Sequence, residues 1–258
     1  MENLKNKVLL IVEGEKTEIN ILGSNTFGLL SLVGAECEIV PFKNAIYELY
    51  DAYKKHEYDD LVSYLRTEKG LIIDDNILSK NAFSAIYLIF DYEPHHQKYS
   101  DKKIKEMLSF YNNETENGKL YINYPMVESY YHLTELPDDG YNERRVSLDG
   151  LNGRSYKKTV NLCSCIKKNK FTNIELCYIA MQNYNKSKLI TKNFNDEINY
   201  IDILDCQIRQ KEETNSIYVL NTLSLLPMDY NREKTIDKLK LKLKDNFLEI
   251  NNEKTEEK

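Results

Sequence analysis

The apolar run Val8-Leu9-Leu10-Ile11-Val12 leads directly into the acidic segment Glu13-Gly14-Glu15-Lys16-Thr17-Glu18. A second apolar run, Ala85-Ile86-Tyr87-Leu88-Ile89-Phe90, leads in the same way into Asp91-Tyr92-Glu93. Each run has the length and continuous apolar character of a strand buried on both faces. Because open parallel sheets build their sites at the carboxyl ends of strands, we expect these acids to gather at one sheet edge. Such a cluster of like charges predicts a divalent-cation site.

Strand-like and helix-like segments alternate through the first half of the chain. The predicted elements are a helix over 17–32, a strand over 36–41, a helical region over 44–66 that breaks near His56, the strand ending at Phe90, a helix over 101–111 capped by Ser100 and a strand over 120–124. A helix over 126–133 follows, with Pro125 suited to its first turn. This alternation is typical of an α/β fold with a mainly parallel sheet flanked by helices.

Turn-forming sequences at 137–140 and 149–153 mark a boundary after the α/β part. We therefore predict an α/β domain over 1–137, a mostly helical C-terminal region over 138–250 and a charged, disordered tail over 251–258. The helices expected in the second region are 156–168, 173–187, 196–213 and 235–247, and residues 217–220 fit a strand or an apolar helix segment equally well.

The charge balance limits the class of protein. The chain has 41 acidic and 35 basic residues, which gives a net charge of −6. A protein that only coats nucleic acid is normally basic. An enzyme that binds nucleic acid locally need not be, because metal ions and a small patch of lysines can neutralise the phosphates at the site.

The N-terminal sequence and the cysteines indicate a cytoplasmic protein. No apolar run approaches the ~18 residues that would span a bilayer, and the N-terminus lacks the layout of a signal peptide. The five cysteines are scattered and odd in number, which does not fit a disulfide framework. Cys163 and Cys165 stand too close together for the usual zinc pair. We expect reduced thiols and no membrane association.

Five acids are candidate ligands, and each has an ordinary alternative. Glu13 and Glu18 also suit the exposed start of a helix, where carboxylates favour the helix dipole. Asp91 and Glu93 would leave the same face of a continuing strand, but they could equally be loop acids. Glu128 lies among apolar neighbours, where a buried structural ion pair would also explain it.

The candidate histidine and basic side chains are weaker. His95 follows the Asp91 loop and could contact phosphate, although exposed loop histidines are common. Arg154, Lys157 and Lys158 form a small basic group after the boundary, and a solvated helix face is the alternative. The chain contains no glycine-rich phosphate loop, no dinucleotide-binding fingerprint and no spacing typical of a nucleophilic triad.

Together these motifs resemble the TOPRIM domain of topoisomerases, primases and OLD-type nucleases. The Glu13-Gly14 segment with Thr17 and Glu18, the Asp91-Tyr92-Glu93 pair and the Pro125-Met126-Val127-Glu128 segment are similar to the RloB-like and OLD-like branch, over about residues 7–135. Two positions depart from that pattern. The second motif ends in Glu93 instead of aspartate, and Tyr124 stands where asparagine is usual.

The resemblance implies a metal-dependent phosphodiester nuclease acting on DNA or RNA. Glu13 would be the key acid, a metal ligand or a general acid/base; Asp91 and Glu93 would bind metal, and Glu18 and Glu128 would complete a second position. Carboxylates suit Mg²⁺ or Mn²⁺, and two such ions stabilise the attacking and leaving oxygens of phosphoryl transfer.

Further roles follow from the same resemblance. Lys157 would stabilise the developing charge, and His95, Arg154 and Lys158 would contact nucleic acid. The branch also implies a role in bacterial anti-phage defence beside an ATPase encoded nearby, and a homo-oligomer is possible. Two other functions stay open: a non-catalytic TOPRIM-like module that binds a partner, and a nucleotidyl-transfer enzyme of the same fold.

Overall fold

The structure of the chain is a computed structural model. It describes residues 7–23, 28–55, 58–72, 77, 79–149, 151–168, 171–195 and 197–256. The predicted helix break near His56 lies outside these ranges.

The α/β part is built on a five-stranded sheet of order β2-β1-β3-β5-β4. Its strands are β1 (Lys7–Val12), β2 (Glu36–Pro41), β3 (Ala85–Asp91), β4 (Asn112–Asn113) and β5 (Gly118–Asn123). All neighbouring strands run parallel except β4, which pairs antiparallel with β5. The prediction of a mainly parallel sheet in which the two strongest apolar runs are neighbours is therefore confirmed, whereas the short strand β4 was not predicted.

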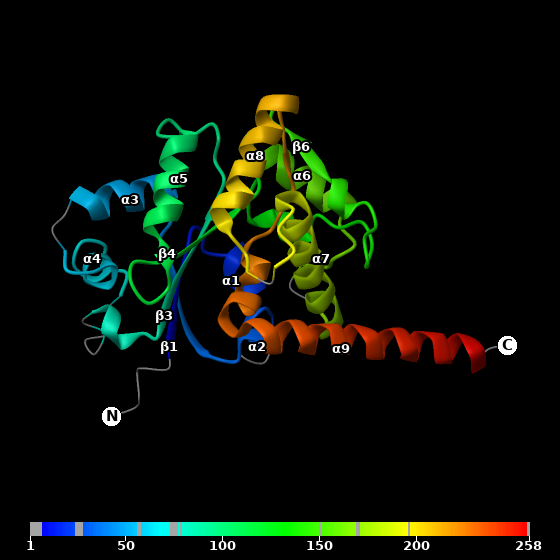
Figure 1. Ribbon diagram of the computed structural model, residues 1–258. Helices are drawn as coiled ribbons and strands as arrows, with labels where there is room; N and C mark the ends of the chain where they lie inside the picture. The colour runs from blue at the N-terminus through cyan, green and yellow to red at the C-terminus, as the bar shows by residue number, and fades with distance from the viewer. Residues whose placement is uncertain are drawn as a thin grey trace.

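Helices cover both faces of this sheet (Figure 1). Those of the first half are α1 (Thr17–Leu22), α2 (Leu30–Val33), α3 (Ile46–Lys55), α4 (Leu61–Thr67) and α5 (Asp101–Phe110), with a short 3-10 turn, η2 (Lys80–Ala82). Helices α3, α4 and α5 lie on one side, where Tyr50 of α3 packs edge-on against Phe110 and Tyr111. Ser100 caps α5 by accepting a hydrogen bond from the backbone of Lys103, as predicted.

The predicted helix over 17–32 is wrong in its extent. Helix α1 ends at Leu22, and α2 does not begin until Leu30. Gly23 and Gly28 both have positive φ angles, of 68° and 73°. A right-handed helix requires negative φ, and glycine reaches the left-handed region without steric cost, so these two glycines end one helix and redirect the chain.

The region after residue 137 is mostly helical, as predicted. Its elements are η4 (Tyr141–Glu143), β6 (Arg145–Ser147), α6 (Gly153–Cys163), α7 (Asn173–Thr191), α8 (Tyr200–Thr214), β7 (Ser216–Tyr218), η5 (Leu223–Leu225) and α9 (Leu226–Glu256). β7 pairs antiparallel with β6, so the ambiguous segment near 217–220 contains a strand. Within the described ranges, no helix is both long and apolar enough to cross a membrane.

Several helix ends in this region differ from the predicted bounds: α6 ends at Cys163 and not at 168, α7 extends to Thr191, α8 begins at Tyr200 and not at 196, and α9 begins at Leu226 and not at 235. Helix α6 begins earlier than expected because Asn152 and Ser155 form a reciprocal capping box at its N-terminus. Helix α9 continues through 251–256, which we expected to be disordered, while 257 and 258 lie outside the described residues. Glutamate and lysine have high intrinsic helix propensity, so a charged tail rich in both can extend a helix.

The predicted helix over 126–133 is instead a short 3-10 turn, η3 (Val127–Tyr131). The Tyr124-Pro125 peptide bond is cis, and Met126 is the residue that precedes the turn, so Pro125 does not occupy the first helical turn. Before it, Tyr124 forms an isolated antiparallel bridge with Leu220. The chain between β5 and η3 is thereby tied to the C-terminal region.

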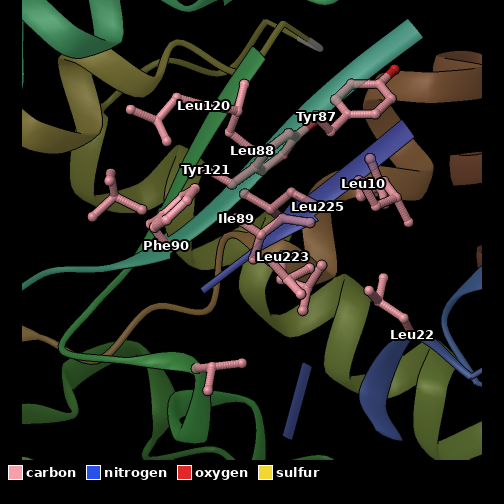
Figure 2. Close-up of a cluster of buried hydrophobic side chains, with 14 of the residues drawn as sticks. Leu10, Leu22, Tyr87, Leu88, Ile89, Phe90, Leu120, Tyr121, Leu223 and Leu225 are labelled. Atoms are coloured by element: carbon pink, nitrogen blue, oxygen red, sulfur yellow. The ribbon is translucent and has the colours of Figure 1, made fainter. Parts of the chain in front are cut away.

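The sheet and the C-terminal region share one hydrophobic core. Figure 2 shows Leu223 and Leu225 of η5 in the same cluster as Leu10, Ile89 and Tyr121 of the sheet strands. A polar tie reinforces this contact, because one carboxylate oxygen of Asp229 in α9 accepts hydrogen bonds from the Tyr121 and Tyr200 hydroxyls, both at 2.7 Å. Lys119 of β5 lies 2.9 Å from the same oxygen. The strands of the sheet therefore depend on the C-terminal region for part of their packing.

This shared core predicts a large effect of Leu225→Ala. Leu225 is fully buried, so its truncation should leave a cavity and lower the free energy of unfolding of the whole chain by about 2–5 kcal/mol. Urea unfolding followed by circular dichroism and tyrosine fluorescence measures this change. Leu241→Ala is the matched control, because Leu241 is 60% exposed and its truncation should change stability by less than about 0.5 kcal/mol. Equal effects of the two changes would contradict a shared core.

Candidate functional site at the acidic edge of the sheet

Glu13 and Asp91 meet at the carboxyl ends of two neighbouring strands. β1 and β3 are paired in parallel so that Val12 faces Ile89, and the backbone N–H of Glu13 donates to the Ile89 carbonyl at 3.0 Å. The backbone N–H of Asp91 in turn donates to Glu13 Oε2 at 3.0 Å. The sheet therefore brings these two sequence-predicted residues together.

Glu18 is drawn to the same edge by the turn that follows β1. Its Oε1 accepts a hydrogen bond from the backbone N–H of Gly14 at 3.0 Å, and the residue is only 5% exposed. A Cβ on Gly14 would stand 2.7 Å from Glu18 Oε2. Glycine at this position thus makes room for the carboxylate as well as for the turn.

Glu128 is the fourth acid of the group and comes from the 3-10 turn η3. It is 2% exposed, and its Oε1 lies 3.2 Å from Lys157 Nζ of α6 and accepts a 3.4 Å hydrogen bond from Thr17 Oγ1 of α1. The turn that carries it is held by the neighbouring Val127, whose backbone N–H donates to Asp91 Oδ1 at 2.7 Å. Here the term acidic edge means Glu13, Glu18, Asp91 and Glu128.

The surroundings of Glu13, Asp91 and Glu18 disfavour the ionised form of these three carboxyl groups. Burial, together with repulsion from Glu93 and Glu18, raises the pKa of Glu13 to about 8 against the opposing effect of the hydrogen bond from Asp91. Burial and then the charges of Glu13, Glu18 and Glu128 raise the pKa of Asp91 far above its usual range. Burial is also the main reason that the pKa of Glu18 is raised. A positive charge placed among these groups would favour their ionised forms and so oppose each of these shifts.

Lys157 is a cation in direct contact with this edge. Its side chain is about half exposed, and its ion pair with Glu128 is its direct link to the acids. Partial burial alone would lower the pKa of Lys157, but attraction to Glu128, Asp91 and Glu18 raises it overall. Lys157 therefore remains charged and partly offsets the carboxylates.

The donor set fits a divalent cation, although the ligands are not preassembled. Oxygen ligands are those that Mg²⁺ and Mn²⁺ prefer. One carboxylate oxygen each of Glu128 and Glu93 is buried with no hydrogen-bond partner among the described residues. Over the same residues, no three histidine, cysteine or acidic side chains are already arranged to hold a metal ion. A cation would be held only after carboxylates turn away from their present partners.

Glu93 and His95 follow Asp91 along the chain, and the charge of Glu93 acts on Glu13. Strand β3 ends at Asp91, and the next turn begins after Glu93, at Pro94. Burial first, and then the charge of Glu48, raises the pKa of Glu93 against the opposing effect of His96. Glu93 and the exposed His95 line a separate cavity together with His96.

Arg154 and Lys158 are exposed on α6 on either side of Lys157 in sequence, and all three line an open groove.

The sequence did not predict Thr17 and Val127 as partners of the acids. Thr17 did stand inside the quoted motif, but its bond to Glu128 joins residues 111 positions apart. No local spacing could reveal a contact over that separation.

Comparison of the chain with protein-family models, with curated proteins and with solved structures found no match.

The raised pKa of Glu13 predicts a pH-dependent stability. The carboxyl titrates near 4.5 in the unfolded chain and at about 8 when folded, so the folded protein binds the extra proton between these values and loses stability as the pH rises through them. Glu13→Gln keeps an acceptor for the Asp91 N–H but cannot ionise. In EDTA, its thermal midpoint relative to the wild type should rise by several degrees from about pH 5 to about pH 8.

Glu15→Gln is the matched control for that experiment. Glu15 is exposed, and its hydrogen bond and charge interaction with Lys43 lower its pKa. Its substitution should therefore give no rise over the same pH range. Parallel curves for Glu13→Gln and the wild type would contradict the proposed electrostatics of the acidic edge.

Proposed function

We propose that this chain is a metal-dependent phosphodiesterase that cleaves nucleic acid. The observation that carries the proposal is the meeting of Glu13 and Asp91 at the ends of adjacent parallel strands, with Glu18 and Glu128 buried beside them. Stable folding does not require four acids at one point, and their mutual repulsion acts against it. Such an arrangement is typical of a site that gains its stability from a bound cation.

Asp91, Glu18 and Glu128 would hold the ion, with Glu13 and Glu93 as further carboxylates at its margin. When bound, Mg²⁺ or Mn²⁺ supplies positive charge that stabilises the oxygens of an in-line phosphoryl transfer. The remaining chemistry belongs to the chain. Water adds to phosphorus while the bond to the leaving oxygen breaks, and Glu13 would take the proton of the water and pass it to the leaving oxygen. Lys157 offsets the negative charge that develops on the phosphate.

The resemblance of the motifs to TOPRIM nucleases of the RloB-like and OLD-like branch supports this function, and the parallel order β2-β1-β3-β5 is compatible with it. From the same resemblance we propose that the protein acts in the bacterial cytoplasm in defence against phage, together with an ATPase encoded nearby. Self-association into a homo-oligomer belongs to the same proposal.

One observation favours a second function. The described residues contain no preassembled trio of metal ligands, and Glu128 already has Lys157 as a counter-ion. A TOPRIM-like module that binds a partner without catalysis would need no metal site, and the ion pair of Glu128 with Lys157 would serve its structure. Cleavage assays separate the two functions, because the second predicts no metal-dependent product from DNA or RNA.

The nuclease proposal predicts that Glu13→Ala and Asp91→Ala abolish cleavage of DNA or RNA in Mg²⁺ or Mn²⁺. Each change removes one ligand or proton-transfer group from a rigid strand end. The thermal midpoint in EDTA should change by only a few degrees, because the relief of repulsion offsets the loss of the hydrogen bonds that Glu13 and Asp91 accept from the backbone of Asp91 and Val127. Both quantities are measured on the same preparation, with the partner ATPase added if the wild type is silent alone. Full activity of Glu13→Ala would end the nuclease proposal.

Lys157→Ala should lower the cleavage rate at saturating substrate by about 10²–10³-fold, because it removes charge stabilisation at the reacting phosphate. Lys158→Ala is the matched comparison on the same helix and should weaken substrate binding more than it slows cleavage. His95→Ala should cost less activity than either strand-end change, because His95 is an exposed loop residue. An equal loss for Lys157→Ala and Lys158→Ala would contradict the role given to Lys157.

A further inference from the structure

A cavity of about 290 Å³ opens beside the acidic edge. Three segments form it: the loop after β3, the segment before η3 and the start of α6. Its lining residues are Tyr92, Glu93, Pro94, His95, His96, Pro125, Met126, Leu151, Asn152, Gly153 and Tyr156. Most of these side chains are apolar or aromatic, and a few polar groups stand among them. Ligand-binding pockets typically have this composition, whereas solvated surface depressions are more polar.

The cavity is held in shape by its surroundings. His96 stacks on the buried ring of Tyr47, with centroids 4.6 Å apart and planes 11° apart. Tyr156 is held through its hydroxyl, which lies 3.0 Å from His132 Nδ1. The start of α6 approaches closely, since a Cβ on Gly153 would stand 3.1 Å from Met126 Cε. The walls are therefore preorganised, which lowers the entropic cost of binding a ligand.

Three connections place the cavity next to the proposed chemistry. Glu93 lines it and also acts electrostatically on Glu13. Met126 lines it and directly precedes Val127, which donates to Asp91. Gly153 lines both the cavity and the open groove that contains Lys157. A ligand that fills the cavity would thus have one end at the acids and another on the basic face of α6.

The size and chemistry of the cavity suit a single planar ring system. Its volume lies at the lower end of the range of about 300–1,000 Å³ that holds drug-sized ligands. Apolar and aromatic walls bind the faces of bases by stacking. Glu93 lines the cavity and its Oε2 has no hydrogen-bond partner among the described residues, so a rotation of this side chain would present an acceptor to the amino or ring N–H groups on the edge of a base.

We propose that the cavity receives one unpaired base of a nucleic-acid strand whose phosphates cross the groove of Arg154, Lys157 and Lys158. This inference rests on the proposed function and names its substrate class: single-stranded or locally opened nucleic acid. A base in an intact duplex must leave its stack to enter such a cavity, which costs a few kcal/mol. An unpaired strand enters without that cost.

Binding, and not cleavage, tests the inference. Fluorescence anisotropy is measured on the full chain with a short labelled DNA strand, with a strand of equal length and charge that lacks all bases, and with the duplex. Ca²⁺ replaces Mg²⁺ and Mn²⁺. The normal strand should bind about tenfold or more tightly than the abasic strand, because each stacked base contributes about 1–3 kcal/mol. It should also bind more tightly than the duplex.

Leu151→Trp fills the cavity with a larger side chain. It should bring the affinity ratio of the normal to the abasic strand close to one while leaving the affinity for the abasic strand unchanged. Leu241→Trp is the matched control, because Leu241 lies on α9, is 60% exposed and lines neither the cavity nor the groove on α6. If Leu151→Trp lowers the thermal midpoint, His95→Ala replaces it as the test, since an exposed loop side chain can be removed without loss of core packing. His95→Ala should lower the ratio severalfold.

Equal affinities for the normal and abasic strands would overturn the inference, even if the wild type cleaves nucleic acid. Displacement of the strand by adenosine monophosphate at comparable concentration would also overturn it, because the cavity would then serve a free nucleotide. A base-dependent affinity that Leu151→Trp removes would support it. If the protein shows this base-dependent affinity but cleaves neither DNA nor RNA, the base site is supported and only the proposed catalysis is contradicted.

Discussion

The parallel pairing of β1 with β3 is the constraint on which the acidic edge depends. Parallel strands end at the same edge of a sheet, so Glu13 and Asp91 cannot be separated while this pairing lasts. The bond from the Asp91 N–H to the Glu13 carboxylate extends the pairing beyond the last strand residues. Asp91 then anchors η3 through Val127, which positions Glu128. A feature of the central sheet thus sets the position of a residue on a separate turn.

The same pairing places like charges close together, and their repulsion destabilises the folded protein. The carboxyl groups are held together by backbone hydrogen bonds and core packing, although burial and mutual repulsion raise the pKa values of Glu13 and Asp91. Lys157 offers only partial compensation, since it pairs with Glu128 from a half-exposed position. Strain of this kind persists where the surrounding structure holds the groups in place, and it is common at functional sites. The shared core between the sheet and the C-terminal helices supplies that support.

Strong local signals made the sheet and part of the site predictable. The buried runs before Glu13 and Asp91 are long and continuous, so both the strands and the meeting of their acids follow from pattern and from the geometry of parallel sheets. The break after Leu22, the 3-10 turn at Glu128 and the pairing of β6 with β7 did not follow. They depend on backbone conformations and on contacts between distant segments. The ion pair of Glu128 with Lys157 is of the same kind, because no local period records which lysine approaches.

The location of a bound Mn²⁺ ion tests the central claim most directly. Crystals of the full chain grown with Mn²⁺, and measured for the anomalous scattering of manganese, locate the ion without reference to any activity. The account predicts an ion held by Asp91 and at least one of Glu13, Glu18 and Glu128, with ligand oxygens at roughly 2.1–2.2 Å, close to the 2.0–2.1 Å of Mg²⁺. Asp91→Asn should remove it. A well-ordered acidic edge with no manganese at saturating Mn²⁺, and with Glu128 still paired to Lys157, would contradict the account.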